Sequence, residues 1–252
     1  MVETKAHQIF RSRIQYLEMH LQTVDVSLSV MRRSVPTSSD DKESVASALG
    51  FEPAKYDELN HPVKEKDRII NHSRARNSEY AVITLYGYFT EYLQNILGEI
   101  YKTKPLDVVG KAPKENTLSY VEIVKLGSYD AISELMIGKV FRQLENERST
   151  KELLDKILAK TVTIDEGIKT NALRYLDMRH LLVHAAGIID QQFIDKYIKD
   201  TSLKAGDKLP TTYENARMAI EAVGLLCRTV DQELINKGFV QQIKPVLPKA
   251  AG

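Results

Sequence analysis

The chain has 252 residues, of which 27% are charged and 43% hydrophobic, a composition typical of folded domains that argues against long disordered regions. Its formal net charge of +1 at pH 7 excludes steering of nucleic acid by the overall field, so any such binding needs a local basic patch. The single cysteine, Cys227, lies in an apolar run, which excludes an internal disulfide framework and predicts a buried thiol. Because we find neither an apolar run that could cross a membrane nor the apolar centre of a signal peptide, we expect a cytoplasmic protein without a membrane partner.

The N-terminal quarter of the sequence predicts one long helix and a connector. Over residues 3–33 the apolar side chains recur at helical spacing: Ile9, Ile14, Leu17, Leu21, Val24, Leu28 and Met31. This pattern is typical of an amphipathic helix that packs on another element. Residues 34–62 contain turn-forming residues, including Pro53 and Pro62, and predict a connector with one or two short helices. We therefore assign residues 1–62 to an N-terminal helix and connector.

The remainder of the chain also has helical periodicity. A long helix is expected over 64–101, and its second half is apolar on most sides, as in a buried core helix. After a loop at 105–114, further helices are expected over 117–126, 129–146, 150–160, 163–187, 190–199 and 211–237. Thr163 with Glu166 has the spacing of a capping box for the fifth of these seven helices. We therefore predict an all-α protein, with a helical domain over 63–240 and a flexible tail over 241–252.

Three polar residues stand out in the helix expected over 164–186. On a helical wheel with about 100° per residue, Arg179 falls near the middle of a broad apolar face. His180 and His184 lie one turn apart on the adjoining face. An arginine keeps its charge, so its burial is costly unless an anion meets it. The apolar face consists of Ile164, Ile168, Ala172, Tyr175, Leu176, Leu182, Val183 and Ala186.

Several interpretations of this trio are open. Arginine and histidine side chains on a helix often have only a structural role, in an ion pair or a satisfied core. The spacing of His180 and His184 would also let both imidazoles meet one metal ion. However, the zincin pattern needs a glutamate directly after the first histidine, where Leu181 stands, and no third ligand follows at a recognisable spacing. We therefore expect neither a metal nor another cofactor.

The segment ALRYLDMRHLLVHAAGIID resembles the HEPN superfamily, whose hallmark is an arginine, a polar residue, a few variable residues and a histidine. Arg179, His180 and His184 match this motif in order and spacing. The helix over 80–97 is similar to the first core helix of the superfamily, with Glu91 where many members carry an acidic residue. The runs GIIDQQFIDKY and GDKLPTTYENARMAIEAV are similar to the branch called RiboL-PSP-HEPN. The resemblance covers about residues 71–237 and leaves the N-terminal helix unexplained.

The resemblance implies a HEPN-like helical bundle, here with an extra N-terminal helix, and the activity of a metal-independent endoribonuclease. Such proteins are commonly toxins or anti-phage effectors, so an antitoxin or defence-system protein is a possible partner beside the RNA substrate. RNA supplies its own nucleophile, the 2′-OH, so the site needs only proton transfer and stabilisation of charge on the phosphate. In this interpretation His184 transfers protons, Arg179 offers a bidentate fork to the phosphate, and His180 positions the phosphate or orients its neighbours.

One histidine cannot serve as base and acid in the same step. A two-fold homodimer that joins two Arg179/His184 sets would solve this problem, and it would explain an apolar motif helix. The products would carry 2′,3′-cyclic phosphate and 5′-hydroxyl ends. The alternative is a HEPN-like fold without nuclease activity that serves as a helical dimerisation or binding module.

Two supporting features have plain alternatives. Glu91 falls on a narrow polar stripe of the long apolar helix, together with Asn77, Thr84 and Asn95, so it could pair with Arg179 or mark a solvated edge. Four basic residues recur every four positions and could form a path for an RNA backbone or a solvated face. They are Lys64, Arg68, His72 and Arg76.

Overall fold

The computed structural model describes residues 2–35, 43–104, 118–145, 150–158, 162–197 and 203–243. Within these residues the regular secondary structure is helical, apart from two isolated bridges, Ser44 with Pro62 and Ile188 with Lys208. This confirms the all-α prediction. The whole loop predicted at 105–114, and residues 244–252 of the predicted tail, lie outside the described ranges. The α-helices are α1 (Lys5–Ser34), α2 (Val45–Ala48), α3 (Lys66–Thr103), α5 (Tyr120–Leu126), α6 (Tyr129–Glu145), α7 (Thr150–Leu158), α8 (Glu166–His184), α9 (Gln191–Tyr197) and α10 (Tyr213–Asn236).

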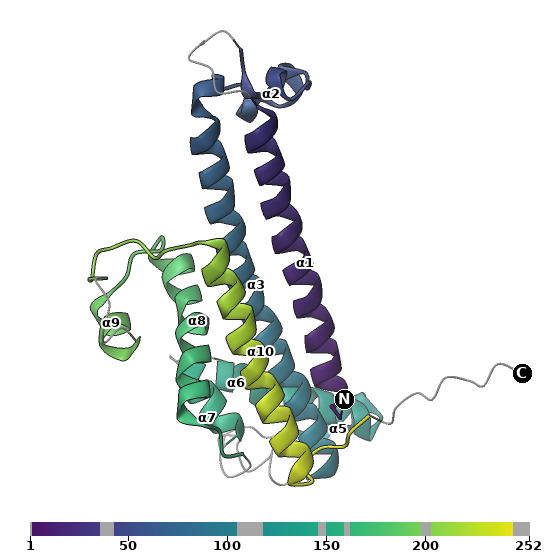
Figure 1. Cartoon of the computed structure of the whole chain (residues 1–252). Helices are drawn as coiled ribbons and strands as arrows, with labels where there is room; N and C mark the ends of the chain where they lie inside the picture. Colours follow the sequence, from purple (N-terminus) through teal and green to yellow (C-terminus); the bar gives the residue numbers. More distant parts are fainter. Residues whose placement is uncertain are drawn as a thin grey trace, which may run out of the picture.

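Helix α3 is the central element of the bundle, with α1, α8 and α10 along it and α6 and α7 against its C-terminal half (Figure 1). Its second half contributes fully buried side chains on most sides, as the sequence predicts. Burying one such large apolar side chain contributes roughly 1.5 to 3 kcal/mol. Cys227 of α10 is buried in the same core, as expected. The buried side chains of α3 include Leu85, Phe89, Leu93, Ile96, Leu97 and Ile100.

The first helix is amphipathic, as predicted, and it shares the core of the helices that follow. Ala6, Phe10, Leu17 and Leu21 are buried in the same hydrophobic cluster as α3, α8 and α10. The connector contains α2 and three 3₁₀ turns, Pro53–Lys55, Asp57–Leu59 and Val63–Glu65. The bundle therefore includes α1, although the resemblance to the HEPN superfamily does not cover it.

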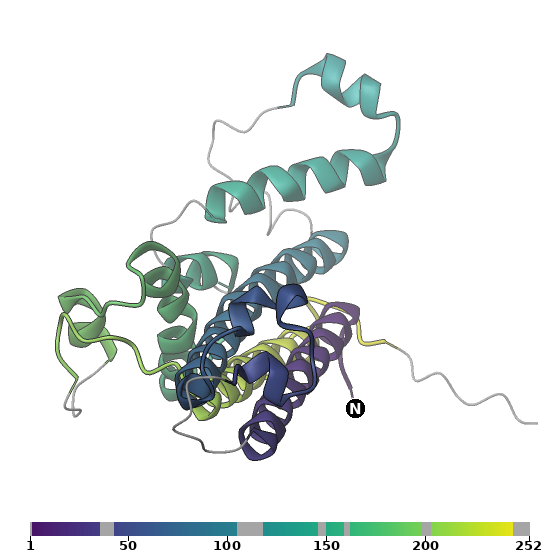
Figure 2. The ribbon, with the colours of Figure 1, turned by 90° about the horizontal axis from the view of Figure 1, so that it is seen from above.

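Beyond the ends of α8 and α10, helices α1 and α3 continue as a two-helix stalk, which we define as residues 20–34 and 66–80 (Figure 1). Seen from above, the connector covers the end of this stalk (Figure 2). Polar contacts join its two helices: the Nε of Arg32 lies 2.9 Å from Asp67, and the Nε of Arg74 lies 3.0 Å from Asp25. The stalk is thus held by ion pairs as well as by apolar contacts.

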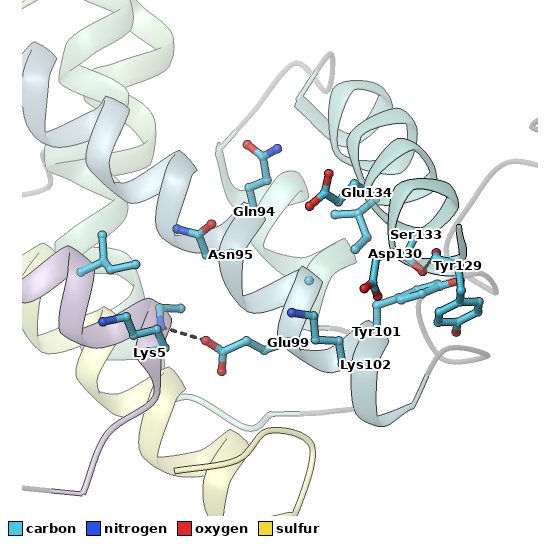
Figure 3. Close-up of a pocket in the computed structure, with 14 residues that line it drawn as sticks. Lys5, Gln94, Asn95, Glu99, Tyr101, Lys102, Tyr129, Asp130, Ser133 and Glu134 are labelled. Carbon is cyan, nitrogen blue, oxygen red and sulfur yellow. Dashed lines mark hydrogen bonds between the residues drawn. The ribbon is translucent and has the colours of Figure 1, made fainter. Parts of the chain in front are cut away.

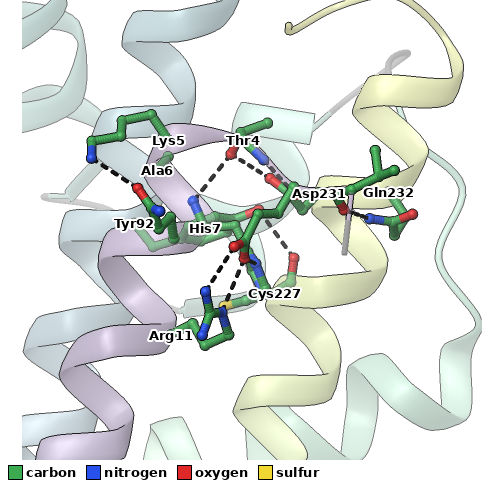
Figure 4. Close-up of polar contacts among 12 residues, drawn as sticks. Thr4, Lys5, Ala6, His7, Arg11, Tyr92, Cys227, Asp231 and Gln232 are labelled. Carbon is green, nitrogen blue, oxygen red and sulfur yellow. Dashed lines mark hydrogen bonds and ion pairs between the residues drawn. The ribbon is translucent and has the colours of Figure 1, made fainter. Parts of the chain in front are cut away.

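A buried polar network fixes the start of α1 against α10 (Figure 4). The carboxylate of Asp231 accepts hydrogen bonds from the backbone N–H of Thr4 at 3.0 Å and from its hydroxyl at 2.5 Å. Thr4 is also the N-cap of α1, because its Oγ1 accepts the N–H of His7 at 3.0 Å. Glu3 completes the network by pairing with Arg11, and this hydrogen bond is the main reason that the pKa of Glu3 is lowered.

We expect Asp231→Ala to lower the free energy of unfolding by about 1 to 3 kcal/mol, because two buried donors of Thr4 lose their acceptor.

The same substitution should also change how stability depends on pH. Burial raises the pKa of Asp231, so the native state holds the carboxyl proton of Asp231 more tightly than the unfolded chain does. Tighter binding of this proton adds to the free energy of unfolding at pH values below the unfolded pKa of about 3.9, and this added stability is lost as the pH rises through the native pKa. Urea unfolding over this pH range should therefore show a weaker pH dependence in the variant. Arg228→Ala, an exposed change one turn away on α10, is the control, and equal stability of the two variants would contradict the prediction.

Candidate functional site

Helix α8 carries the candidate residues at its C-terminal end. The helix begins after Asp165, whose side chain accepts the N–H of Ile168 at 3.0 Å, so the predicted capping box at Thr163 is wrong. It ends at His184, and Gly187 then adopts a left-handed conformation with φ +77° while its N–H donates to the carbonyl of Leu181 at 2.9 Å. Glycine suits this conformation because it has no Cβ.

The flanks of α8 are covered by other helices of the same chain. Its buried residues pack against α3, α10 and α7, and α9 is tied to it through Asp177, which accepts from Lys196 at 2.7 Å and from the hydroxyl of Tyr197 at 2.6 Å. We expected a second copy to explain the apolar surface of this helix, and that argument is wrong, because α10 and α3 of the same chain already bury most of it. Val183 and Ile188 remain exposed beside the motif, at 45% and 42%.

The structure brings Arg179, His180 and His184 together on an open surface. The guanidinium of Arg179 lies 4.9 Å from the ring centroid of Tyr86 on α3, and this side chain is half-buried rather than enclosed. The rings of His180 and His184 are exposed, with centroids 4.9 Å apart. We call the surface formed by Tyr86, Arg179, His180 and His184 the motif face.

The charge of Arg179 is available to an incoming group. Among the ion pairs of the described residues none involves Arg179, whose charged group instead stacks over the aromatic face of Tyr86. A planar guanidinium can form two parallel hydrogen bonds with a phosphate, and a histidine can give or take a proton near neutral pH. The motif face therefore combines an anion-binding group with two titratable rings.

The predicted pair between Glu91 and Arg179 is wrong. The Glu91 carboxylate instead forms an ion pair with Arg13 of α1, with 2.8 Å between the guanidinium nitrogen and the carboxylate oxygen. Because Glu91 follows Tyr86 by five residues, it points about 140° away from the side of α3 that faces α8. The guanidinium of Arg13 also lies 5.3 Å from the ring centroid of Tyr88, so two residues of α3 hold this side chain on the side of α3 that faces α1. The acidic residue thus links α1 to α3 and is separated from the motif face.

The four basic residues of the predicted path lie on the stalk and just before it. Arg68, His72 and Arg76 are exposed on α3, about 27, 21 and 15 Å from Tyr86 along the helix at 1.5 Å per residue. At about 100° per residue, Arg68 and His72 lie within about 40° of the direction of Tyr86, and Arg76 lies about 80° from it. Lys64 is exposed in the 3₁₀ turn that precedes α3. Arg68 pairs with Glu65, and Arg76 pairs with Glu79 at 2.6 Å, so a phosphate would have to compete with these carboxylates.

Tyr86 is the residue of the motif face that the sequence analysis missed. It belongs to the apolar run of the long helix, and its spacing does not distinguish it from the neighbouring core positions. Its role depends on which side of α3 faces α8, which is a tertiary feature. A search for aromatic residues near a lone arginine would have found it only once this packing was known.

A cavity of about 650 Å³ lies away from the motif face, between the start of α1, the C-terminal half of α3, and α6 (Figure 3). Its polar walls include Glu99, Lys102, Asp130 and Glu134, and no residue of the motif face lines it. Glu99 accepts the N–H of Ala6 at 2.8 Å, and burial raises the pKa of Glu99. This carboxylate thus supports the start of α1.

Within the described ranges, no three His, Cys, Asp or Glu side chains gather as a metal site would require. In the same part of the chain, none of the helices combines the length and the apolar character needed to cross a bilayer. Comparisons of the chain with family models, with curated proteins and with solved structures find no match.

Proposed function

We propose that this protein is a metal-independent endoribonuclease of the HEPN type and that the motif face is its active site. The observation that carries the proposal is the grouping of Arg179, His180 and His184 at one exposed helix end, with a guanidinium that makes no ion pair to a described carboxylate. RNA is the substrate class that this combination suits, since its phosphates need a cationic partner and its 2′-OH needs only a base.

The cleavage consists of one displacement at phosphorus. A histidine accepts the proton of the 2′-OH, the 2′-oxygen attacks the adjacent phosphate, and the bond to the 5′-oxygen breaks as that oxygen gains a proton. Arg179 binds the non-bridging oxygens, where negative charge increases in the transition state. His184 is the proposed proton-transfer group, and His180 positions the phosphate. Glu91 has no part in this scheme, because it contacts Arg13 instead.

The step needs both an acid and a base, so we propose a homodimer in which two motif faces meet. The exposed Val183 and Ile188 beside the motif would then lie at or near the interface. The basic residues of the stalk would guide the RNA backbone toward the motif face. As a toxin or anti-phage effector acting in the cytoplasm, the protein would be held in check or triggered by an antitoxin or defence-system partner.

A HEPN-like binding module without catalysis is the second candidate, and the open surface around the two histidines is compatible with it. The two candidates differ in a direct assay. Purified protein incubated with a generic RNA in EDTA should yield discrete shorter products on a denaturing gel if the proposal holds. Intact RNA both with EDTA and with added divalent metal would favour the binding module.

A further inference from the structure

Helix α1 carries a second apolar stripe on the side turned away from α3. Tyr16, Met19, Val26 and Val30 are 66%, 56%, 59% and 47% exposed, and with Thr23 they alternate in steps of three and four residues. We call these five residues the outer stripe. Spacing of this kind is the heptad pattern by which one helix packs along another.

The outer stripe lies opposite the stripe that α1 uses inside its own chain. The inner stripe precedes it by two residues, which is about 200° around a helix. The residues of the inner stripe are Ile14, Leu17, Leu21, Val24, Leu28 and Met31. Helix α1 is therefore built to pack on two opposite sides, and within the described residues only the inner side is covered along the stalk (Figure 1).

Polar groups in and beside the outer stripe already have partners. The hydroxyl of Thr23 donates to the carbonyl of Met19 at 2.7 Å, and that of Ser27 donates to the carbonyl of Thr23 at 2.8 Å. Covering these side chains would therefore leave no hydroxyl proton unsatisfied. Of the flanking positions, Gln15, Gln22, Ser27 and Ser29 are uncharged, and the ring of His20 lies against Tyr80 of α3 with centroids 5.8 Å apart, so no row of charged side chains along the stripe selects a charged partner.

We infer that the outer stripe is a docking surface for α1 of a second copy, packed antiparallel. The heptad spacing suits a helix as partner, and α1 of a second copy supplies a helix with a matching stripe. In the antiparallel register Met19 meets Val30 of the second copy and Thr23 meets its Val26, so a large residue faces a small one in the first pair. Tyr16 then meets the guanidinium of Arg33, a cation–π pair. The parallel arrangement would instead place the two Arg33 side chains against each other.

This surface is separate from the motif face, because α1 and α8 lie on different sides of α3 (Figure 2). The inference does not rest on the proposed function. A molecule that associates through both surfaces would form assemblies larger than a dimer, since each surface generates its own two-fold contact.

Sedimentation equilibrium at micromolar concentration tests the inference. Val26→Glu/Val30→Glu should at least halve the mass of the wild-type assembly, because it places four carboxylates in the apolar contact. Leu225→Glu, a change of similar chemistry at a site of α10 that is 45% exposed, should keep the wild-type mass. All three proteins should have equal helicity by circular dichroism. A monomeric wild type, or a double variant with the mass of the wild type, would overturn the inference.

Disulfide trapping tests the same contact without destabilising charges. The native Cys227 is buried, so new surface cysteines are the reactive ones. A mixture of Thr23→Cys and Val26→Cys chains should form a mixed disulfide-linked dimer under mild oxidation, while neither variant alone should do so efficiently. Self-linking of either single variant would overturn the antiparallel pairing, and failure to link in every sample would overturn the docking surface itself.

Discussion

Replacing His184 by alanine should lower the rate of RNA cleavage by about 10²- to 10⁴-fold, because proton transfer by a positioned side chain is lost. Arg179→Ala should have an effect of similar size, since it removes the cation that stabilises the charged phosphate in the transition state. Single-turnover cleavage of a labelled RNA measures both variants. Their far-ultraviolet circular dichroism and melting temperatures should match those of the wild type, because His184 is exposed and Arg179 makes no ion pair to a described carboxylate.

Asn171→Ala is a matched control, since it removes an exposed polar side chain from the same helix at a distance from the motif face. It should cleave RNA at the wild-type rate. If both motif variants also cleaved at that rate, the trio would be a structural feature and the binding module would be preferred. Activity that survived His184→Ala and disappeared with a chelator would indicate that a metal ion, and not His184, is needed for RNA cleavage.

Replacing Phe10 by alanine should lower the free energy of unfolding by about 3 to 5 kcal/mol, the usual cost of removing a buried phenyl ring. Phe10 is 1% exposed, and its ring centroid lies 5.5 Å from that of Tyr92 on α3. The variant leaves a void between the first helix and the central helix. Guanidinium unfolding followed by circular dichroism gives the difference.

Tyr120→Ala on α5 is the control for this prediction, because Tyr120 is 89% exposed. It should change the unfolding free energy by less than about 0.5 kcal/mol. A Phe10→Ala variant as stable as this control would mean that α1 is an appendage, in conflict with the shared core.

The sequence predicts the helices well because their periodicity is strong. The apolar stripe of α1 indicates a helix that is buried on one side. The near-continuous apolar second half of α3 indicates a helix that is buried on most sides. Helix ends were harder to place, since Thr163 and Asp165 both suit an N-cap and only the local backbone decides between them. That α1 shares the main core could not be predicted, because an amphipathic pattern gives the existence of a partner surface without its identity.

The candidate site was predicted in part. Arg179, His180 and His184 lie in one helix, so their grouping follows from spacing alone. Contacts between helices do not follow from spacing, which is why Glu91 was assigned to Arg179 when its partner is Arg13. Tyr86 was missed for the same reason, and the apolar surface of α8 was attributed to a second copy when α10 and α3 cover most of it.

The most direct test of the proposed activity is the chemical identity of the RNA ends that the wild-type protein produces in the presence of EDTA. Attack by the 2′-OH requires 2′,3′-cyclic phosphate and 5′-hydroxyl ends, which mass spectrometry of the fragments identifies. We predict these ends for the wild type and their absence for His184→Ala. Fragments with 5′-phosphate ends, or cleavage only when divalent metal is added, would contradict metal-independent cleavage at the motif face.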